Sequence, residues 1–122
     1  MSYPQVENKI ISELEKVRLS FMNNRAKGRR NETKARDLLV LEGFSVQLTP
    51  MPSKFSLQND LFGLWDLMAV SSEKIRFIQV KSNKTAPKAW REEAIAWQCP
   101  SNCTKELWIF FDRVKMPKII VL

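Results

Sequence analysis

The sequence predicts an α/β fold in which helices flank a central mixed β-sheet of about five strands. The chain has 122 residues, which is enough for one domain with its own hydrophobic core. Its 44% hydrophobic residues, four Trp and seven Phe are typical of a globular protein. Apolar residues follow helical spacing in some segments and short strand-like runs in others. Their order is helix, helix, three strands, helix, two strands, which predicts layered α/β architecture.

The first two predicted elements are helices. Apolar residues recur at helical spacing at Val6, Ile10, Leu14, Val17 and Phe21. We therefore expect residues 1–24 to be a helical addition and residues 25–122 to be the core of a single domain. A basic connector containing Gly28 follows, where the first helix ends or bends. Asn31 is placed to cap a second helix from Glu32 to Glu42, and Gly43 to end it.

The remaining predicted elements are strands, with one further helix among them. Runs of apolar and β-branched residues bounded by turn residues predict the strands. In order, the elements are a strand Phe44–Thr49, a hairpin of Leu64–Val70 and Ile75–Ser82, a helix Lys88–Cys99, and strands Leu107–Asp112 and Lys118–Leu122.

Charge and residue usage limit the classes of function. Lys and Arg number 20 against 13 Asp and Glu, so the formal net charge is +7. A polyanionic partner, most commonly nucleic acid, explains such an excess, although a merely soluble basic protein is the alternative. There is no His, and Cys99 and Cys103 are the only cysteines. This argues against a four-ligand structural zinc site, which usually takes Cys or His, and it excludes Ser/His and Cys/His nucleophilic catalysis. A Cys99–Cys103 disulfide stays open.

The sequence shows no sign of export or membrane insertion. Its first seven residues lack the basic start and apolar run of a signal peptide. No apolar stretch approaches the ~18 residues of a membrane span. We therefore expect no membrane association and a cytoplasmic location, in the host cytoplasm if the protein is viral.

Polar residues interrupt the central hairpin, where a core strand ordinarily carries none. Burying such groups without partners costs a few kcal/mol each. Gln79 and Lys81 point to the same face of their strand, and the hairpin places Asp66 beside them. The Asp66 carboxylate, the Gln79 side-chain carbonyl and the Val80 main-chain carbonyl are hard oxygen donors suited to Mg²⁺ or Mn²⁺. Lys81 is suited to orienting water or stabilising phosphate charge. The alternative is a structural Asp66–Lys81 ion pair without a metal.

The order of these motifs resembles that of the PD-(D/E)XK, or restriction-endonuclease-like, nuclease superfamily. Its acidic residue and (Asp/Glu/Gln)-x-Lys motif match Leu64-Trp65-Asp66 and, after twelve intervening residues, Gln79-Val80-Lys81. The archaeal and viral Holliday junction resolvases also carry Lys-Gly-x-x-x-Glu and Gly-Phe-x-Val. These match Lys27-Gly28-Arg29-Arg30-Asn31-Glu32 and Gly43-Phe44-Ser45-Val46, so the resemblance covers about residues 25 to 112. Trp65 replaces the usual Pro. Gln79 replaces the more usual Glu and removes one negative charge, which leaves the number of bound metals open.

The resemblance implies a restriction-endonuclease-like core and a magnesium-dependent endodeoxyribonuclease in which Mn²⁺ substitutes for Mg²⁺. The implied catalytic residues are Glu32, Asp66, Gln79 and Lys81, and the implied metal ligands are Glu32, Asp66, Gln79 and Val80. It favours a structure-selective Holliday junction resolvase acting on branched DNA. Two alternatives stay open: another superfamily nuclease that cuts flaps, nicks or duplexes in repair or defence, and a non-cleaving DNA-binding module of the same fold.

The expected DNA contacts are basic residues near these motifs. They are Arg25, Lys27, Arg29 and Arg30 beside Glu32, Lys54 in the loop before Asp66, and Lys84 after the Lys81 strand. A solvated helix start and a plain surface loop are the structural alternatives. Asp60 in the same loop is a rival metal ligand.

Resolving a four-way junction requires two cuts related by twofold symmetry, and the chain holds one set of motifs. We therefore expect a homodimer. The apolar runs 108–111 and 119–122, with the N-terminal helix, are candidate interface material.

Overall fold

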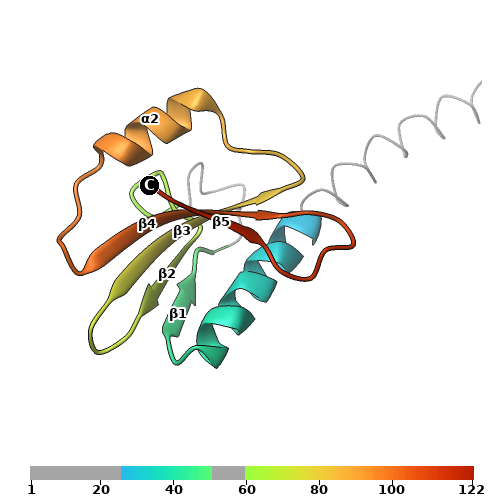
Figure 1. Cartoon of the computed structure of the whole chain (residues 1–122), viewed down its shortest axis with the longest axis horizontal. Helices are drawn as coiled ribbons and strands as arrows, with labels where there is room; N and C mark the ends of the chain where they lie inside the picture. Colours follow the sequence, from blue (N-terminus) through green and yellow to red (C-terminus); the bar gives the residue numbers. More distant parts are fainter. Residues whose placement is uncertain (1–25, 51–59) are drawn as a thin grey trace, which may run out of the picture.

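The structure, a computed structural model, describes residues 26–50 and 60–122. A helix over residues 26–41 is followed by β1 (Ser45–Leu48), β2 (Leu67–Val70), β3 (Ile75–Ser82), α2 (Lys88–Ala96), β4 (Cys103–Phe110) and β5 (Lys118–Val121) (Figure 1). The five strands form one sheet in the order β1-β2-β3-β4-β5. Helix α2 is the crossover between the parallel neighbours β3 and β4, and all other neighbours are antiparallel. The predicted α/β fold with a mixed sheet of five strands is confirmed.

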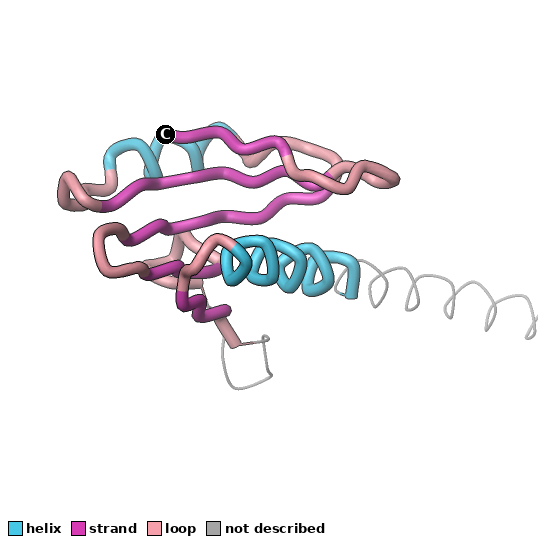
Figure 2. The backbone as a smooth tube through the Cα atoms, turned by 60° about the horizontal axis from the view of Figure 1, so that its bottom comes forward, coloured by secondary structure: helices cyan, strands magenta, loops and turns pink. Residues whose placement is uncertain are grey.

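The two helices cover opposite faces of this sheet (Figures 1 and 2). Alternation along β3 sends Ile78 and Val80 toward Ala35 and Leu39 of the helix over residues 26–41. On the other face Phe77 packs in a cluster with Ala94 of α2. Fully burying one large apolar side chain contributes about 1.5–3 kcal/mol, so the two apolar layers hold the sheet between the helices.

The helix over residues 26–41 starts earlier than the sequence predicts. Asn31 lies within the helix and does not cap it, and Gly28 neither breaks nor bends it. The Asn31 side chain instead donates a hydrogen bond to Ser82 Oγ at 2.6 Å, so tertiary contact replaces the predicted cap. The predicted end is confirmed, because Gly43 adopts a φ of 96° and its N–H donates to Val40 O.

The predicted strand Leu64–Val70 is shorter in the structure, because β2 begins at Leu67. The preceding residues form a turn in which the Trp65 N–H donates to Leu61 O at 3.0 Å. The Trp90 indole donates to Leu64 O at 2.9 Å and fixes this turn against α2. Asp66 therefore follows a turn that the Trp90 side chain of α2 holds in place.

The α2–β4 junction also differs from the prediction. Strand β4 begins at Cys103, four residues before the predicted start, because it pairs with the whole length of β3. Helix α2 ends at Ala96 and not at Cys99. Lys105 Nζ donates to Ala94 O at 2.8 Å and to Trp97 O at 2.7 Å, which satisfies carbonyls at the end of the helix.

Several predictions fall outside the described ranges: the N-terminal helix of residues 1–24, Arg25 and Lys54.

Cys99 and Cys103 are free thiols. Within residues 26–50 and 60–122, neither helix has the length and apolar character needed to cross a bilayer.

Candidate active site

Asp66 is the centre of a buried polar group at the start of β2. Its N–H continues the pairing with β3 by donating to Ile78 O at 2.9 Å. Its side chain is turned to the neighbouring strand, where Oδ2 accepts a hydrogen bond from the Val80 N–H at 2.8 Å. Asp66 is only 8% exposed. The carboxylate is therefore fixed by the main chain of the strand that carries Gln79 and Lys81.

Gln79 lies beside Asp66, as expected from the pairing of the two strands. With its amide oriented so that Nε2 faces the available acceptors, it donates to Leu64 O at 2.8 Å and to Asp66 Oδ2 at 3.3 Å. Gln79 is 6% exposed. It thus connects the turn before β2 to the Asp66 carboxylate.

Glu32 reaches the same region from the helix over residues 26–41. Arg29 Nη1 lies 3.3 Å from Glu32 Oε2 and donates to Thr49 O at 2.8 Å. Arg29, predicted as a DNA contact, therefore ties Glu32 to the end of β1. This positioning role was not among the predicted ones, although the three-residue separation of Arg29 and Glu32 on a helix permits such a pair.

The site holds more negative charge than its described neighbours neutralise. Burial raises the pKa of Asp66 to about 8; the Val80 hydrogen bond opposes this shift, and the charges of Glu32 and Asp60 add to it. Burial also raises the pKa of Glu32, with Arg29 opposing. The described residues form no Asp66–Lys81 ion pair, although the Lys81 charge lowers the pKa of Asp66. The alternative of a structural Asp66–Lys81 ion pair is therefore not what the structure contains.

Lys81 and two of the predicted DNA contacts line one hollow next to this site. The active-site hollow has a volume of about 390 Å³ and includes Lys27, Lys81 and Lys84 among its lining residues. Lys27 is ion-paired with Asp112 at 2.8 Å, whereas Lys84 and the more distant Arg30 are exposed. Asp66, Gln79 and Glu32 do not line this hollow; Lys81, whose charge acts on Asp66, links the hollow to the carboxylates.

The donor set fits a divalent cation bound with the help of water. Among residues 26–50 and 60–122, no three Asp, Glu, His or Cys side chains form a ready-made metal cluster. Asp66 and Glu32 nevertheless interact electrostatically, and Asp60, the rival ligand from the loop, adds its charge to both. Mg²⁺ commonly takes one or two protein carboxylates and keeps several waters. Buried carboxylates with too little positive charge around them are the kind of site that such an ion stabilises.

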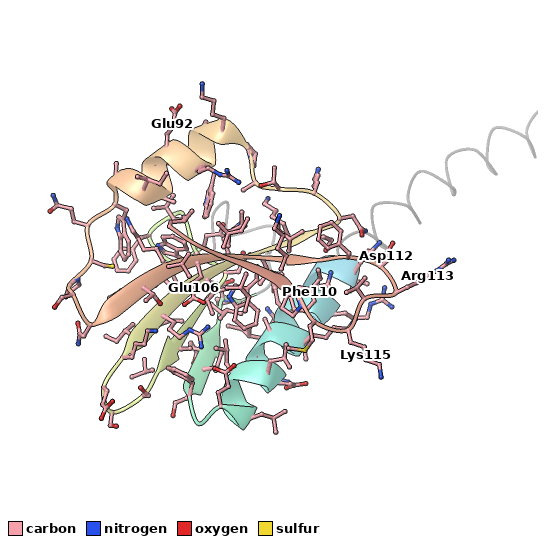
Figure 3. All side chains as sticks on the ribbon, viewed as in Figure 1. Glu92, Glu106, Phe110, Asp112, Arg113 and Lys115 are labelled. Carbon is pink, nitrogen blue, oxygen red and sulfur yellow. The ribbon has the colours of Figure 1, made fainter. Side chains whose placement is uncertain are left out.

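A second buried carboxylate, Glu106, lies on β4 (Figure 3). Arg76 of β3 donates to both of its oxygens, at 2.8 and 2.7 Å. Thr104 and the Trp108 indole donate to it as well, at 2.6 and 3.1 Å. Burial alone raises the pKa of Glu106, but these hydrogen bonds outweigh it and hold the pKa below its usual range. This pair was not predicted from the sequence, because Arg76 lies within the predicted strand Ile75–Ser82 but Glu106 lies just before the predicted strand Leu107–Asp112.

Comparison with known proteins establishes the fold. No family profile matches the chain, and no curated protein matches it by sequence. Among solved structures it is similar to Archaeoglobus fulgidus Hjc, a Holliday junction resolvase from an archaeal hyperthermophile. The TM-score is 0.59 at 14% sequence identity, over 77% of this chain and 76% of Hjc. The expected restriction-endonuclease-like fold is therefore confirmed.

Proposed function

We propose that this protein is a metal-dependent DNA endonuclease of the PD-(D/E)XK superfamily that acts on branched DNA, most specifically as a Holliday junction resolvase. The observation that carries the proposal is the grouping of Glu32, Gln79 and Lys81 around Asp66. These residues come from a helix and two strands, in the order that the superfamily motifs require. The fold shared with Hjc supports the same proposal.

In this proposal Asp66 and Glu32 hold the cation, Mg²⁺ or Mn²⁺, with oxygen atoms of Gln79 and Val80 completing the protein ligands. When bound, the ion supplies a water of lowered pKa and positive charge for the phosphorane-like transition state. The Val80 N–H fixes one Asp66 oxygen and leaves the other for the cation. Arg29 keeps Glu32 directed toward the strand ends.

Lys81 has the role of orienting the attacking water and stabilising charge on the phosphate. It lines the active-site hollow and is half-buried, and its charge lowers the pKa of Asp66. A charge pre-positioned in a partly dehydrated site stabilises the transition state better than one free in water. Lys27, Lys84 and Arg30 are proposed to hold the flanking phosphates.

A homodimer belongs to the proposal, because one chain has one such site and a junction needs two cuts. The expected interface runs are only partly available, since Trp108, Ile109 and Phe110 are buried within the protomer. Ile119 and Val121 of β5 are 43% and 64% exposed at the edge of the sheet and offer apolar surface for a twofold contact.

A cleavage panel tests the proposal. Four-way junction, flap, single-strand and duplex DNA are incubated with the protein, with Mg²⁺ or with excess chelator. We expect Mg²⁺-dependent cuts at symmetric positions of the junction, and no cuts by Asp66→Asn. Cleavage of flaps alone contradicts the resolvase assignment, and a protein that binds DNA but cuts none of the four substrates is the non-cleaving module. Light scattering, with an expected mass of about twice 14.3 kDa, tests the dimer.

A further inference from the structure

The loop between β4 and β5 (residues 111–117) carries a second basic hollow, which the proposed mechanism does not use. Its volume is about 260 Å³, and its lining includes Lys34 of the helix over residues 26–41 and Arg113 and Lys115 of the loop. Figure 3 shows Arg113 and Lys115 extending from this loop away from the sheet, with Asp112 nearer to it. We call this feature the hairpin hollow.

Positive charge in the hairpin hollow is largely unbalanced. Lys34, Arg113 and Lys115 are exposed, and none of them forms an ion pair with another residue of ranges 26–50 and 60–122. Asp112 is the acidic residue of the lining, and it is ion-paired with Lys27. Three cations face solvent around one neutralised carboxylate, which is a surface that attracts a polyanion.

The hairpin hollow is joined to the active-site hollow by direct contacts. Lys27 lines the active-site hollow and pairs at 2.8 Å with Asp112, which lines the hairpin hollow. Asn83 belongs to the first hollow, and its Oδ1 accepts a hydrogen bond from the Asp112 N–H at 2.9 Å. The strand ends that hold Lys81 therefore also hold the loop that carries Arg113 and Lys115.

Arg113 has an unusual backbone conformation, which it shares with Phe62 and Asn83. The Val114 N–H donates to Phe111 O at 3.1 Å and closes a turn, within which Arg113 adopts a φ of 66°. Glycine suits this conformation, and a residue with a Cβ costs roughly 1 kcal/mol more there. The turn therefore presents a long cationic side chain at a position whose backbone conformation would suit glycine.

We propose that the hairpin hollow binds backbone phosphates of the DNA strand that runs from the active site past the Lys27–Asp112 pair. The inference rests on the proposed DNA endonuclease function and extends it to a second phosphate contact, made by the β4–β5 loop. The lining offers three exposed cations, and its one amide, Asn31, is buried and hydrogen-bonded to Ser82, so we expect contacts to phosphates that are independent of base sequence. Exposed Val114 and Met116 on the same loop suit a protein contact, but the unbalanced cations favour the polyanion.

DNA affinity measured over a range of KCl concentrations tests this inference in the full chain. Lys115→Ala removes one cation, and Arg113→Gly removes another while suiting the positive φ, so both variants keep the turn. Lys74→Ala removes a comparable exposed lysine from the β2–β3 turn and is the matched control. Each hairpin variant is expected to reduce the slope of log affinity against log salt by about 0.9 on duplex arms. At moderate salt we expect several-fold weaker binding, whereas Lys74→Ala stays within about twofold of wild type.

Arm length sharpens the test, because the loss of affinity should disappear when the arm is too short to reach the loop. If wild type binds and cuts DNA but the hairpin variants keep the full salt slope, this inference is wrong and the proposed function stands. If wild type neither binds nor cuts any DNA, both are wrong. If the hairpin variants keep the salt slope of wild type but differ from it in molecular mass in solution, the hollow is a protein contact and the inference is wrong.

Discussion

Asp66 and Glu106 are both carboxylates buried in the same sheet, and their surroundings differ in one respect. Glu106 receives hydrogen bonds from Arg76, Thr104 and the Trp108 indole, and Arg76 supplies a full opposite charge. Asp66 receives the Val80 N–H and the Gln79 amide, both neutral, while two further carboxylates lie in its surroundings. The pKa of Glu106 is lowered, and that of Asp66 is raised to about 8.

The Glu106 carboxylate stabilises the folded state, whereas the charged Asp66 carboxylate destabilises it. Breaking a neutralised, fully hydrogen-bonded pair destabilises a protein, because it leaves a buried charge without a partner. Removing a buried charge that has no partner relieves the fold instead. Residues of the second kind are expected at functional sites, where stability is exchanged for chemistry.

The largest expected effect is that of Asp66→Asn on cleavage. The change keeps the volume and the acceptor for the Val80 N–H but removes the charge that the proposed cation needs. We expect at least about a 10³-fold loss of cleavage, beyond the 10²–10³ that loss of one neutral donor causes. Stability should move the other way and rise by several degrees in Tm. A variant that cleaves normally, or that unfolds more easily than wild type, contradicts this account of Asp66.

The gain in stability expected for Asp66→Asn depends on pH, and the sign of this dependence follows from the pKa of Asp66. The unfolded carboxyl loses its proton near pH 3.8 and the folded one near pH 8, so the native state binds more protons between these values. The charge therefore lowers stability progressively as pH rises through this window. The Tm difference between Asp66→Asn and wild type should grow from pH 4 to pH 8 in thermal denaturation scans.

Glu106→Gln is the counterpart, with an expected loss of about 3 kcal/mol. It removes the buried counter-charge of Arg76, whose side chain is 12% exposed, and leaves Arg76 paired only with the exposed Glu42. Because the folded pKa of Glu106 is lowered, its stabilisation is present above the usual pKa of 4.5 and is lost as pH falls through the folded value. Urea denaturation at pH 7 and pH 3.5 measures this, and the difference between the two proteins should be smaller at the lower pH. Per-molecule cleavage by the folded fraction should be unchanged.

About two orders of magnitude in cleavage rate is the expected loss for Lys81→Ala. Lys81 forms no ion pair with the described residues, so stability should change little. A matched Lys84→Ala variant removes a neighbouring exposed lysine from the same hollow and should weaken DNA binding with a much smaller effect on the cleavage step. Equal rate losses in single-turnover cleavage would remove the distinction between the two lysines.

The smallest expected effect is that of Gln79→Glu, and its sign depends on metal. Without a cation, the new carboxylate faces Leu64 O and Asp66 Oδ2, so the Tm should fall by several degrees. With Mg²⁺ bound, a carboxylate is the stronger donor and the loss should be recovered. Thermal scans with and without Mg²⁺ measure the difference. If Mg²⁺ does not restore the Tm of Gln79→Glu, Gln79 is a packed core amide and not a metal ligand.

The fold and the neighbourhood of Asp66 followed from local sequence signals. Strand periodicity predicted β3 to the residue and placed Gln79 beside Asp66, and Gly43 marked the helix end. The predicted cap at Asn31 was wrong, because Ser82, 51 positions along the chain, supplies the hydrogen-bond partner for Asn31. The predicted break at Gly28 was also wrong, because the helix continues through it. The Arg76–Glu106 pair joins neighbouring strands, and the Lys27–Asp112 pair and the Arg29–Thr49 hydrogen bond join a helix to distant parts of the chain. A single sequence does not show which of these distant residues meet.

The central claim is that the uncompensated carboxylates around Asp66 bind a divalent cation. Calorimetric titration of Mn²⁺ into wild type, Asp66→Asn and Glu106→Gln, at a temperature where all three are folded, tests it most directly. We expect saturable binding to wild type and to Glu106→Gln, and none to Asp66→Asn. Absence of saturable binding to wild type, or equal binding to Asp66→Asn, would contradict the claim.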